Sequence, residues 1–353
     1  APPEMEKDIE KRLPNIIAEN RVRDIPLEEA VRTGAVEYTD LFPAYAGQIA
    51  RMVDLEAIRR AGLKVAVDSM FGAGSGYFRR LIGDGATEII EMHSERNPLF
   101  PGLKQPEPTA ANLPALCQAV RLSGASIGLA TDGDGDRIGV VDETGKVITP
   151  LQVFGLLALY LLEIRGQRGA IVKTINTTDM VNKLGEMYGV PVFETKVGFK
   201  HVAPIMEAED ALVSGEESGS FAFRGHIPER DGILSGLILL DMMAKTNKKP
   251  SEMIDRLYRR VAPHHYHRTD VEFPAPEREA IAGRLAGNIP EHLGGVKATK
   301  VNTMDGHHFR MEDGSWLLIR FSGTEPLLRI YAEAATPERA MALIAEAKAL
   351  LRI

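Results

Sequence analysis

Three aspartates at alternate positions, Asp132, Asp134 and Asp136, stand between two apolar runs near the middle of the chain. Their carboxylates repel one another, and a bound cation relieves that repulsion. Ligand sets made only of oxygen favour a hard ion such as Mg²⁺ over zinc. The apolar runs at 126–130 and 138–141 predict that this metal loop (residues 132–137) joins two strands at their exposed ends. We therefore expect a magnesium site here.

A calcium EF-hand is the first alternative, because the three aspartates take its first, third and fifth positions and Glu143 takes the twelfth. Arg137 replaces the glycine that the sharp turn needs at the sixth position, and the flanking residues resemble strands rather than helices. This pattern disfavours an EF-hand. A solvated acidic turn is the other alternative.

Three further stretches bear groups that could bind a ligand. Lys173 follows the apolar strand pattern of 170–172, and open α/β sheets place ligand groups at such strand ends. Residues 214–220 combine acidic and hydroxyl groups with flexible glycine backbone, which suits sugar hydroxyls. Residues 320–326 combine a guanidinium, two hydroxyls and a glycine amide, which suit a phosphate dianion. For the last two stretches, a plain loop and a plain hairpin turn are the alternatives.

Three other motifs are not assigned to a site. The glycines of 72–76 do not have the G-x-G-x-x-G spacing of a dinucleotide loop, so a tight turn from strand to helix is favoured. His93 and Ser94 could form a nucleophile pair, but the sequence shows no partner for them. The histidines of 264–267 have no nearby carboxylate or cysteine in the sequence to complete a metal site.

The composition is that of a globular protein with two or three domains: 353 residues, 44% hydrophobic and 26% charged. A formal net charge of -7 argues against a nucleic-acid partner. The single Cys117 excludes an internal disulfide framework, and with no signal-peptide pattern we expect a cytoplasmic protein. The apolar stretch 151–164 is too short to cross a bilayer, so we expect a core helix capped by Thr149 and no membrane partner.

Strand and helix patterns alternate along most of the chain and predict an α/β fold. Expected elements are the strands 63–68, 89–90, 170–172, 191–195 and 211–213, with helices at 77–82, 113–121, 180–188 and 231–243. The last region changes to an α+β pattern, with strands at 269–273, 316–321 and 327–334 and helices at 278–286 and 337–351.

Taken in order, these loops resemble those of the α-D-phosphohexomutase superfamily, the phosphoglucomutases and phosphomannomutases, from about Tyr38 to the end of the chain. The resemblance is based on the metal loop, Gly215–Gly219, Arg320–Pro326, Val172–Thr174 and Thr195–Lys200. It implies two consecutive α/β/α domains with mixed sheets, at 38–145 and 146–262. A small α+β domain, similar to the TATA-box-binding protein, would follow at 263–353.

The resemblance also implies a role for each site residue. Asp132, Asp134 and Asp136 would hold Mg²⁺ together with a phosphoserine oxygen. Arg137 would touch that phosphate, and Lys173 is a candidate for proton transfer or charge stabilisation. The substrate-binding residues would be Glu216, Ser218 and Lys200 at the sugar, and Arg320, Ser322, Gly323 and Thr324 at the phosphate that does not react.

The implied reaction interconverts hexose 1-phosphate and hexose 6-phosphate, of glucose or mannose, through a phosphoserine and a hexose bisphosphate. This sequence departs from the family because the N-terminal domain with its serine motif is absent, and residues 1–37 look like the end of that domain and its linker. We therefore expect the serine domain to act as a partner in cis or in trans, and this chain alone to be inactive. A phosphosugar-binding module without turnover is the alternative. A phosphatase with an aspartate nucleophile is disfavoured, because the pattern of small residues after Asp134 is missing.

Overall fold

The computed structural model describes residues 3–21, 24–287, 290–322 and 326–353. The chain forms two compact units, residues 1–47 and 48–353. The first contains α1 (Pro3–Ala18), whose described side chains are almost all exposed, and α2 (Leu27–Arg32). α3 (Phe42–Met52) runs across the division between the units.

The second unit opens with a mixed five-stranded sheet in the order β2-β1-β3-β4-β5. β1 pairs in parallel with β2 and β3, whereas β4 is antiparallel to β3 and β5. All residues of β3 and β4 are buried, as expected for strands covered on both faces. The elements are β1 (Lys64–Asp68), β2 (Glu88–Met92), β3 (Ile127–Thr131), β4 (Ile138–Val141), β5 (Val147–Ile148), α4 (Leu55–Arg60), α5 (Tyr77–Ile82) and α6 (Pro114–Ser123).

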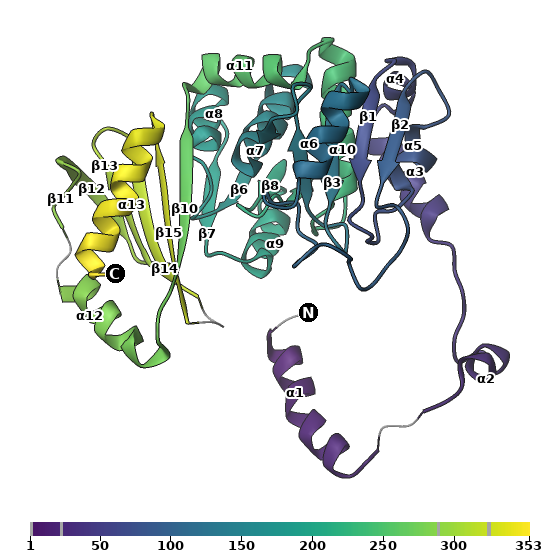
Figure 1. Ribbon diagram of the computed structural model, residues 1–353, viewed down its shortest axis with the longest axis horizontal. Helices are drawn as coiled ribbons and strands as arrows, with labels where there is room; N and C mark the ends of the chain where they lie inside the picture. The colour runs from purple at the N-terminus through teal and green to yellow at the C-terminus, as the bar shows by residue number, and fades with distance from the viewer. Residues whose placement is uncertain (1–2, 22–23, 288–289, 323–325) are drawn as a thin grey trace. The chain divides into compact units, whose positions relative to one another are not determined.

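A four-stranded sheet follows, and its order β7-β6-β8-β9 repeats the plan of the first. Three strands are parallel, and the fourth turns back antiparallel beside β8. α7 and α10 pack against strands of both sheets and so join the two layers (Figure 1). The elements are β6 (Ile171–Thr174), β7 (Val192–Thr195), β8 (Val213–Gly215), β9 (Phe221–Phe223), α7 (Pro150–Leu159), α8 (Met180–Tyr188), α9 (Phe199–Ala208), α10 (Gly232–Thr246) and α11 (Pro250–Val261).

The core helix expected at 151–164 differs from the prediction in its last turn. Thr149 caps its start, where its hydroxyl accepts a hydrogen bond from the Gln152 amide at 3.2 Å. After Leu159 the helix widens into a π-helix, η1 (Tyr160–Ile164). Within it the Tyr160 hydroxyl donates to buried Asp241 at 2.6 Å, and the Arg165 guanidinium pairs with the same carboxylate. Both groups share this one buried carboxylate, and apolar periodicity gives no sign of the wider turn.

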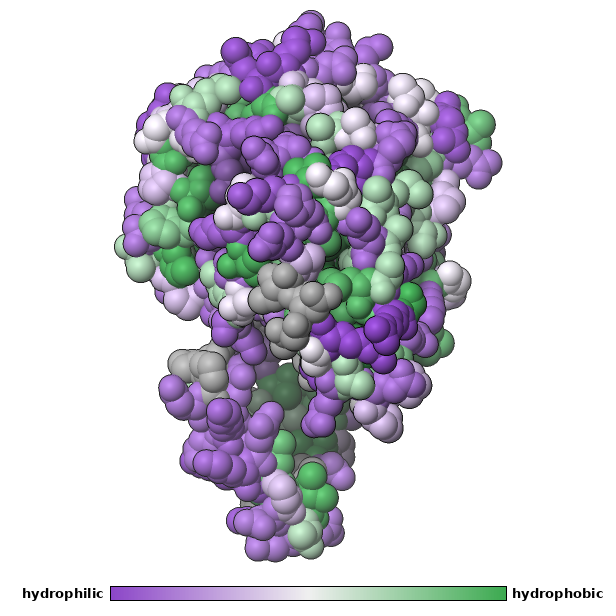
Figure 2. All heavy atoms as spheres, turned by 90° about the vertical axis from the view of Figure 1, so that its left-hand side faces the viewer, coloured by the Kyte–Doolittle hydropathy of each residue, from purple (hydrophilic) through white to green (hydrophobic). Residues whose placement is uncertain are grey.

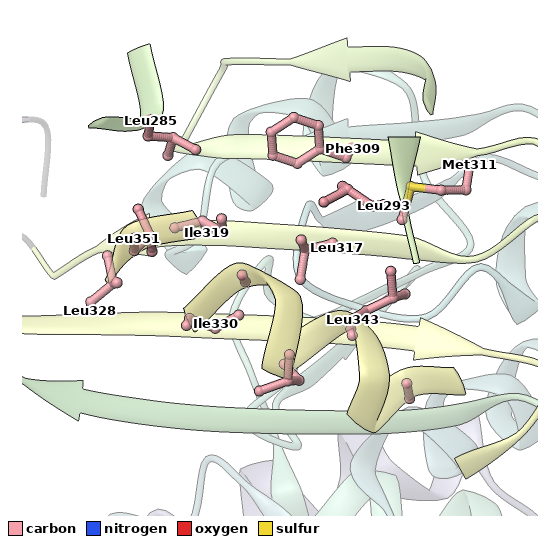
Figure 3. Packing of buried hydrophobic residues seen from close by; sticks show 14 of the residues in the cluster. Leu285, Leu293, Phe309, Met311, Leu317, Ile319, Leu328, Ile330, Leu343 and Leu351 are labelled. Carbon is pink, nitrogen blue, oxygen red and sulfur yellow. The ribbon is translucent and has the colours of Figure 1, made fainter. Parts of the chain in front are cut away.

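The C-terminal region is a six-stranded antiparallel sheet in the order β10-β15-β14-β13-β12-β11. α12 and α13 cover one face, where Leu317, Ile330 and Leu343 are fully buried in one apolar cluster (Figure 3). Burying each such side chain contributes about 1.5–3 kcal/mol. The elements are β10 (His265–Glu272), β11 (His292–Leu293), β12 (Val296–Asn302), β13 (His307–Met311), β14 (Trp316–Phe321), β15 (Leu327–Ala334), a short 3₁₀ helix η2 (Ala275–Glu277), α12 (Arg278–Gly287) and α13 (Pro337–Leu351).

The predicted fold class, two mixed α/β layers followed by an α+β unit, is confirmed, while the exact domain boundaries stay a prediction. The face of the C-terminal region that Figure 2 shows is mostly hydrophilic, with apolar residues scattered over it. Across the described part of the chain, no helix combines the length and the apolar character that a membrane span requires. Cys117 is buried, and burial raises the pKa of its thiol. Because the thiolate is the reactive form, the raised pKa makes this residue inert, as expected in the core.

Candidate active site

All three loops singled out in the sequence join neighbouring antiparallel strands. The metal loop connects β3 to β4, and the sugar loop (residues 216–220) connects β8 to β9. Because the two sheets share one strand order, these two loops occupy equivalent places in them. The strands on either side of the phosphate loop (residues 320–326), β14 and β15, pair antiparallel. Gly323 and Thr324, predicted there as phosphate ligands, lie outside the described residues.

Asp132, Asp134 and Asp136 each offer an oxygen, and these three atoms lie within 4.8 Å of one another. Among the described residues, no other group of three or more His, Cys, Asp or Glu side chains comes together in this way. Burial, together with the charges of the other two aspartates, raises the pKa of Asp132 to about 7.

The metal loop fits a divalent cation. Asp136 Oδ1 is buried and has no hydrogen-bond partner in the protein, although Arg137 Nε lies 3.7 Å away. An oxygen-only donor set with an unsatisfied buried oxygen suits a hard ion. The cluster can therefore hold a metal ion, and its identity as Mg²⁺ is part of the proposal below.

Arg137, the last residue of the metal loop, contacts the first of its aspartates. Its backbone amide donates to Asp132 Oδ1 at 3.0 Å, and its Nε lies 3.2 Å from Asp132 Oδ2. Its Nη1 reaches Glu107 at 2.9 Å. The structure thus brings Arg137 together with the aspartates as predicted, and its contact with a phosphate stays a prediction.

The metal loop and the sugar loop lie side by side. Arg137 and Ser220 form an antiparallel bridge, and the Ile138 amide donates to the Gly219 carbonyl at 3.0 Å. The Gly232 amide donates to the Gly135 carbonyl at 3.0 Å, at an approach so close that a Cβ on Gly232 would lie 2.2 Å from the Arg137 carbonyl oxygen. The two sheets therefore share one functional edge.

Arg230 reinforces this junction, because its Nη2 lies 2.9 Å from Asp136 Oδ2. No pattern in the sequence predicted this residue. It precedes Asp231, the N-cap of α10, and no spacing rule links it to an aspartate on another sheet. Only the fold brings the two charges together.

Glu216 of the sugar loop is buried and faces the segment 196–200. Its Oε1 accepts a hydrogen bond from the Gly198 amide at 3.1 Å. Burial raises the pKa of Glu216, and the charge of Arg230 opposes that rise. Ser218 Oγ donates to Ser220 Oγ at 3.1 Å, while Lys200 is exposed at the start of α9.

Asp305 joins the same segment to the phosphate loop. Its Oδ2 accepts from the Val197 amide at 2.9 Å and from Arg320 Nε at 2.9 Å. Ser322 of the same loop is buried, and its amide donates to the Leu327 carbonyl at 2.7 Å. Asp305 was not predicted, although an Asp-Gly pair between two strands is a turn signal that could have drawn attention to it.

Lys173 lies in a different environment from the other predicted site residues. Its side chain is completely buried, and Nζ lies 2.8 Å from Asp179 and 3.6 Å from Glu194. Arg310 of β13 pairs with the same two carboxylates, at 2.6 and 3.0 Å. We call these four residues the charge cluster. Burial opposes ionisation of Asp179, but Lys173 and Arg310 hold its pKa well below the usual range. None of the partners of Lys173 is a predicted site residue, and its role in proton transfer stays a prediction.

Models of three consecutive domains of one enzyme family match the chain. They are phosphoglucomutase/phosphomannomutase alpha/beta/alpha domain II at residues 43–145, alpha/beta/alpha domain III at 149–261 and the C-terminal domain at 277–350. The chain belongs to the α-D-phosphohexomutase superfamily. The metal loop thus lies in the domain II match, the sugar loop in the domain III match and the phosphate loop in the C-terminal match.

Individual phosphohexomutases show the same relationship. A phosphoglucomutase/phosphomannomutase of Thermococcus kodakarensis is 33% identical over 87% of this chain. A phosphoglucosamine/phosphogalactosamine mutase of Sulfurisphaera tokodaii is 28% identical over 94% of it. A crystal structure described as a "putative phosphomannomutase" from Thermus thermophilus superposes with a TM-score of 0.76 at 34% identity and covers 90% of this chain and 67% of its own.

This chain spans only part of these relatives. It covers 64% of the Thermococcus kodakarensis protein and 73% of the Sulfurisphaera tokodaii protein. The activity of a whole phosphohexomutase is accordingly proposed below.

Proposed function

We propose that this polypeptide forms the metal-, sugar- and phosphate-binding part of a phosphohexomutase that interconverts hexose 1-phosphate and hexose 6-phosphate. The proposal rests on one observation, a continuous set of contacts between the three loops. Arg137 of the metal loop forms a bridge with Ser220 of the sugar loop, Glu216 of the sugar loop contacts Gly198, and Asp305 joins Val197 to Arg320 of the phosphate loop. One hexose phosphate could therefore contact all three loops.

Every predicted site residue other than Lys173 has a task in this proposal. Asp132, Asp134 and Asp136 hold Mg²⁺, which neutralises charge on the phosphoryl group when it is bound. Arg137 contacts the same phosphate. The remaining residues orient the substrate: Glu216, Ser218 and Lys200 at the sugar hydroxyls, and Arg320, Ser322, Gly323 and Thr324 at the phosphate that does not react.

Phosphoryl exchange also needs an acceptor that stores the group between the two half-reactions. We assign this role to a phosphoserine outside these 353 residues, in cis or in trans, with a hexose bisphosphate as the intermediate. Water is no substitute, because transfer to water gives hydrolysis instead of isomerisation. The cytoplasmic location remains a prediction from the cysteine count.

A phosphosugar-binding module without turnover is the second candidate. The complete burial of Lys173 favours it, because a lysine enclosed by two carboxylates has no open path to a substrate. Both candidates require phosphosugar binding, and they differ only in turnover.

Binding of hexose 6-phosphate by calorimetry tests what the two candidates share. Arg320→Ala removes a charge-assisted contact worth roughly 1.5–3 kcal/mol, so we expect affinity for glucose 6-phosphate to fall about tenfold or more. Lys348→Ala, which removes a cation from α13 of the same sheet unit, is the matched control and should bind like the parent. Equal binding by Arg320→Ala and the parent would show that the phosphate role is wrong.

A coupled assay separates the two candidates. With glucose 1-phosphate, catalytic glucose 1,6-bisphosphate and Mg²⁺, the polypeptide alone should give no glucose 6-phosphate. Turnover should appear when it is joined to, or mixed with, the serine domain of a relative, and mannose and glucosamine phosphates test the substrate range. Persistent inactivity with that domain favours the binding module. Robust turnover without it contradicts the assignment of the nucleophile and directs the search to Ser94.

A further inference from the structure

The turn that follows β1 has an unusual backbone. Met70 and Phe71 have φ angles of 46° and 59°, and His93 at the end of the neighbouring β2 has 47°. Left-handed backbone at residues other than glycine is strained and persists only where surrounding contacts enforce it. Three such residues at adjacent strand ends therefore need an explanation.

Asp68 and His93 supply the enforcing contacts. Asp68 is 1% exposed, and its Oδ1 accepts from the Met70 amide at 2.9 Å. His93 Nδ1 lies 3.0 Å from Oδ1 and 3.1 Å from Oδ2 of the same carboxylate. The Phe71 amide donates to the His93 carbonyl at 2.8 Å, and the Phe71 and His93 rings lie 4.6 Å apart. The histidine that had no partner in the sequence thus finds one on the next strand.

The other half of the turn packs against the backbone of the metal loop. The Ala73 amide donates to the Gly133 carbonyl at 3.0 Å. A Cβ on Gly72 would lie 2.5 Å from the Gly133 oxygen and 2.8 Å from the Asp132 oxygen, so glycine alone permits this approach. The turn thus contacts the Asp68–His93 pair on one side and the metal loop on the other.

We infer that Asp68 and His93 are positioning residues for the metal loop. They hold the strained turn against Asp132 and Gly133, so the mutually repelling carboxylates stay close together before a cation arrives. Without the pair, Met70 and Phe71 relax towards negative φ and Gly72 withdraws from the loop. The inference rests on the proposed function only in that the metal loop binds a divalent cation.

Mn²⁺ binding to the full polypeptide, followed by the electron paramagnetic resonance signal of free Mn²⁺, tests the inference. His93→Ala should weaken Mn²⁺ binding about tenfold, the low end of the roughly 10–100-fold effects of outer-shell partners. His93→Asn should bind nearly as the parent does. Asparagine tolerates left-handed backbone, and its side-chain amide takes the place of Nδ1 and donates to Asp68.

Asp68→Asn tests the same pair from its other member and keeps the size of the side chain. It removes the charge of the acceptor and so should also weaken Mn²⁺ binding, and its effect should not add to that of His93→Ala, because both variants weaken the same pair. Thr87→Val is the matched control. Thr87 is buried just before β2, at the end away from the metal loop, and its hydroxyl donates to the Ile58 carbonyl. Its loss should lower stability without changing Mn²⁺ affinity.

Unchanged Mn²⁺ affinity in both His93→Ala and Asp68→Asn overturns the inference, as does an equal loss in Thr87→Val. Glucose 6-phosphate binding should stay at the parent value in the His93 variants, and a parallel loss there would reveal general unfolding and overturn the positioning role. If Asp134→Ala abolishes Mn²⁺ binding and His93→Ala leaves it unchanged, the positioning role is wrong while the proposed metal site stands. A parent that binds no Mn²⁺ refutes the proposed metal site as well.

Discussion

Replacing Lys173 by methionine tests whether this lysine stabilises the junction between the second and third sheets. Lys173 is completely buried in the charge cluster, where two cations face two carboxylates. Methionine keeps most of the volume and removes one positive charge. Asp179 and Glu194 are then left with Arg310 as their only cation in the cluster.

The magnitude follows from these contacts. Breaking a buried ion pair by removing one partner costs about 3–5 kcal/mol. Because Arg310 still reaches Asp179 at 2.6 Å and Glu194 at 3.0 Å, we expect the low end, about 3 kcal/mol at pH 7. With an m-value of about 2 kcal/mol/M, that is a shift of about 1.5 M in the urea midpoint.

The pH dependence has a definite sign. In the parent the pKa of Asp179 is held below its usual range, so this carboxylate stabilises the fold above its unfolded pKa, and the contribution is lost as the pH falls. In Lys173→Met, the Asp179 carboxylate contributes much less to the unfolding free energy. The gap in unfolding free energy between parent and Lys173→Met should therefore stay constant from pH 7 to about pH 5 and narrow as the pH falls below about 4.

Urea unfolding followed by tryptophan fluorescence is the assay. Trp316 is the single tryptophan of the chain, and it packs with Ile175 in a buried cluster beside β6, so it reports on this junction. Lys183→Met is the control, because the Lys183 ammonium donates to the Val261 carbonyl at 3.0 Å and no carboxylate pairs with it among the described residues. Lys173→Met/Asp179→Asn should recover part of the loss. Equal midpoints for Lys173→Met and Lys183→Met would refute the reasoning.

Two further predictions concern carboxylates with shifted pKa values. Burial raises the pKa of Asp132 to about 7, so protons compete with the metal ion for this carboxylate. Calorimetry should therefore show Mg²⁺ binding about tenfold weaker at pH 6 than at pH 8, with nearly one proton released per ion at pH 6. A pH-independent affinity would contradict this. Burial opposes ionisation of Glu163, but hydrogen bonds from Arg260, Tyr188 and Arg256 lower its pKa to about 2. Thermal unfolding should therefore show Glu163→Gln to be less stable than the parent at pH 7, with a difference that shrinks as the pH falls from about 4.5 towards 2, whereas a constant difference would argue against it.

The sequence was most informative where chemistry or burial imposes a local pattern. The alternating aspartates predicted the metal loop, and the Thr149-Pro150 pair predicted the start of α7. Strands β3 and β4 were visible because their residues are all apolar or small and are buried on both faces. In contrast, β12 and β13 carry many charged and polar residues and were not predicted. β13 pairs with β14 and with β12. Such pairing between strands produces no pattern in the local sequence.

The sequence could not show which groups meet across layers. Arg230, Asp305 and the partner of His93 belong to contacts between segments far apart in the chain. Lys173 was placed correctly at a strand end, but the sequence did not reveal that Arg310 of the last sheet would enclose it with two carboxylates. Local spacing identified which loops could bind ligands, and tertiary contacts determined how they are arranged.

The position of the metal and sugar loops between adjacent antiparallel strands has a consequence for how the protein folds. Such a loop closes by pairing residues that are near neighbours in the chain, as Thr131 does with Ile138, and hairpins form within about 1–10 μs. The parallel pairs around them, such as β1 with β3, join distant segments and form more slowly, because a long chain must close first. Each loop can thus take its shape early and locally, whereas the register between loops is set only when the layers dock. A folding intermediate with formed hairpins and undocked layers would hold the ligand groups of each loop in place without yet bringing the loops together.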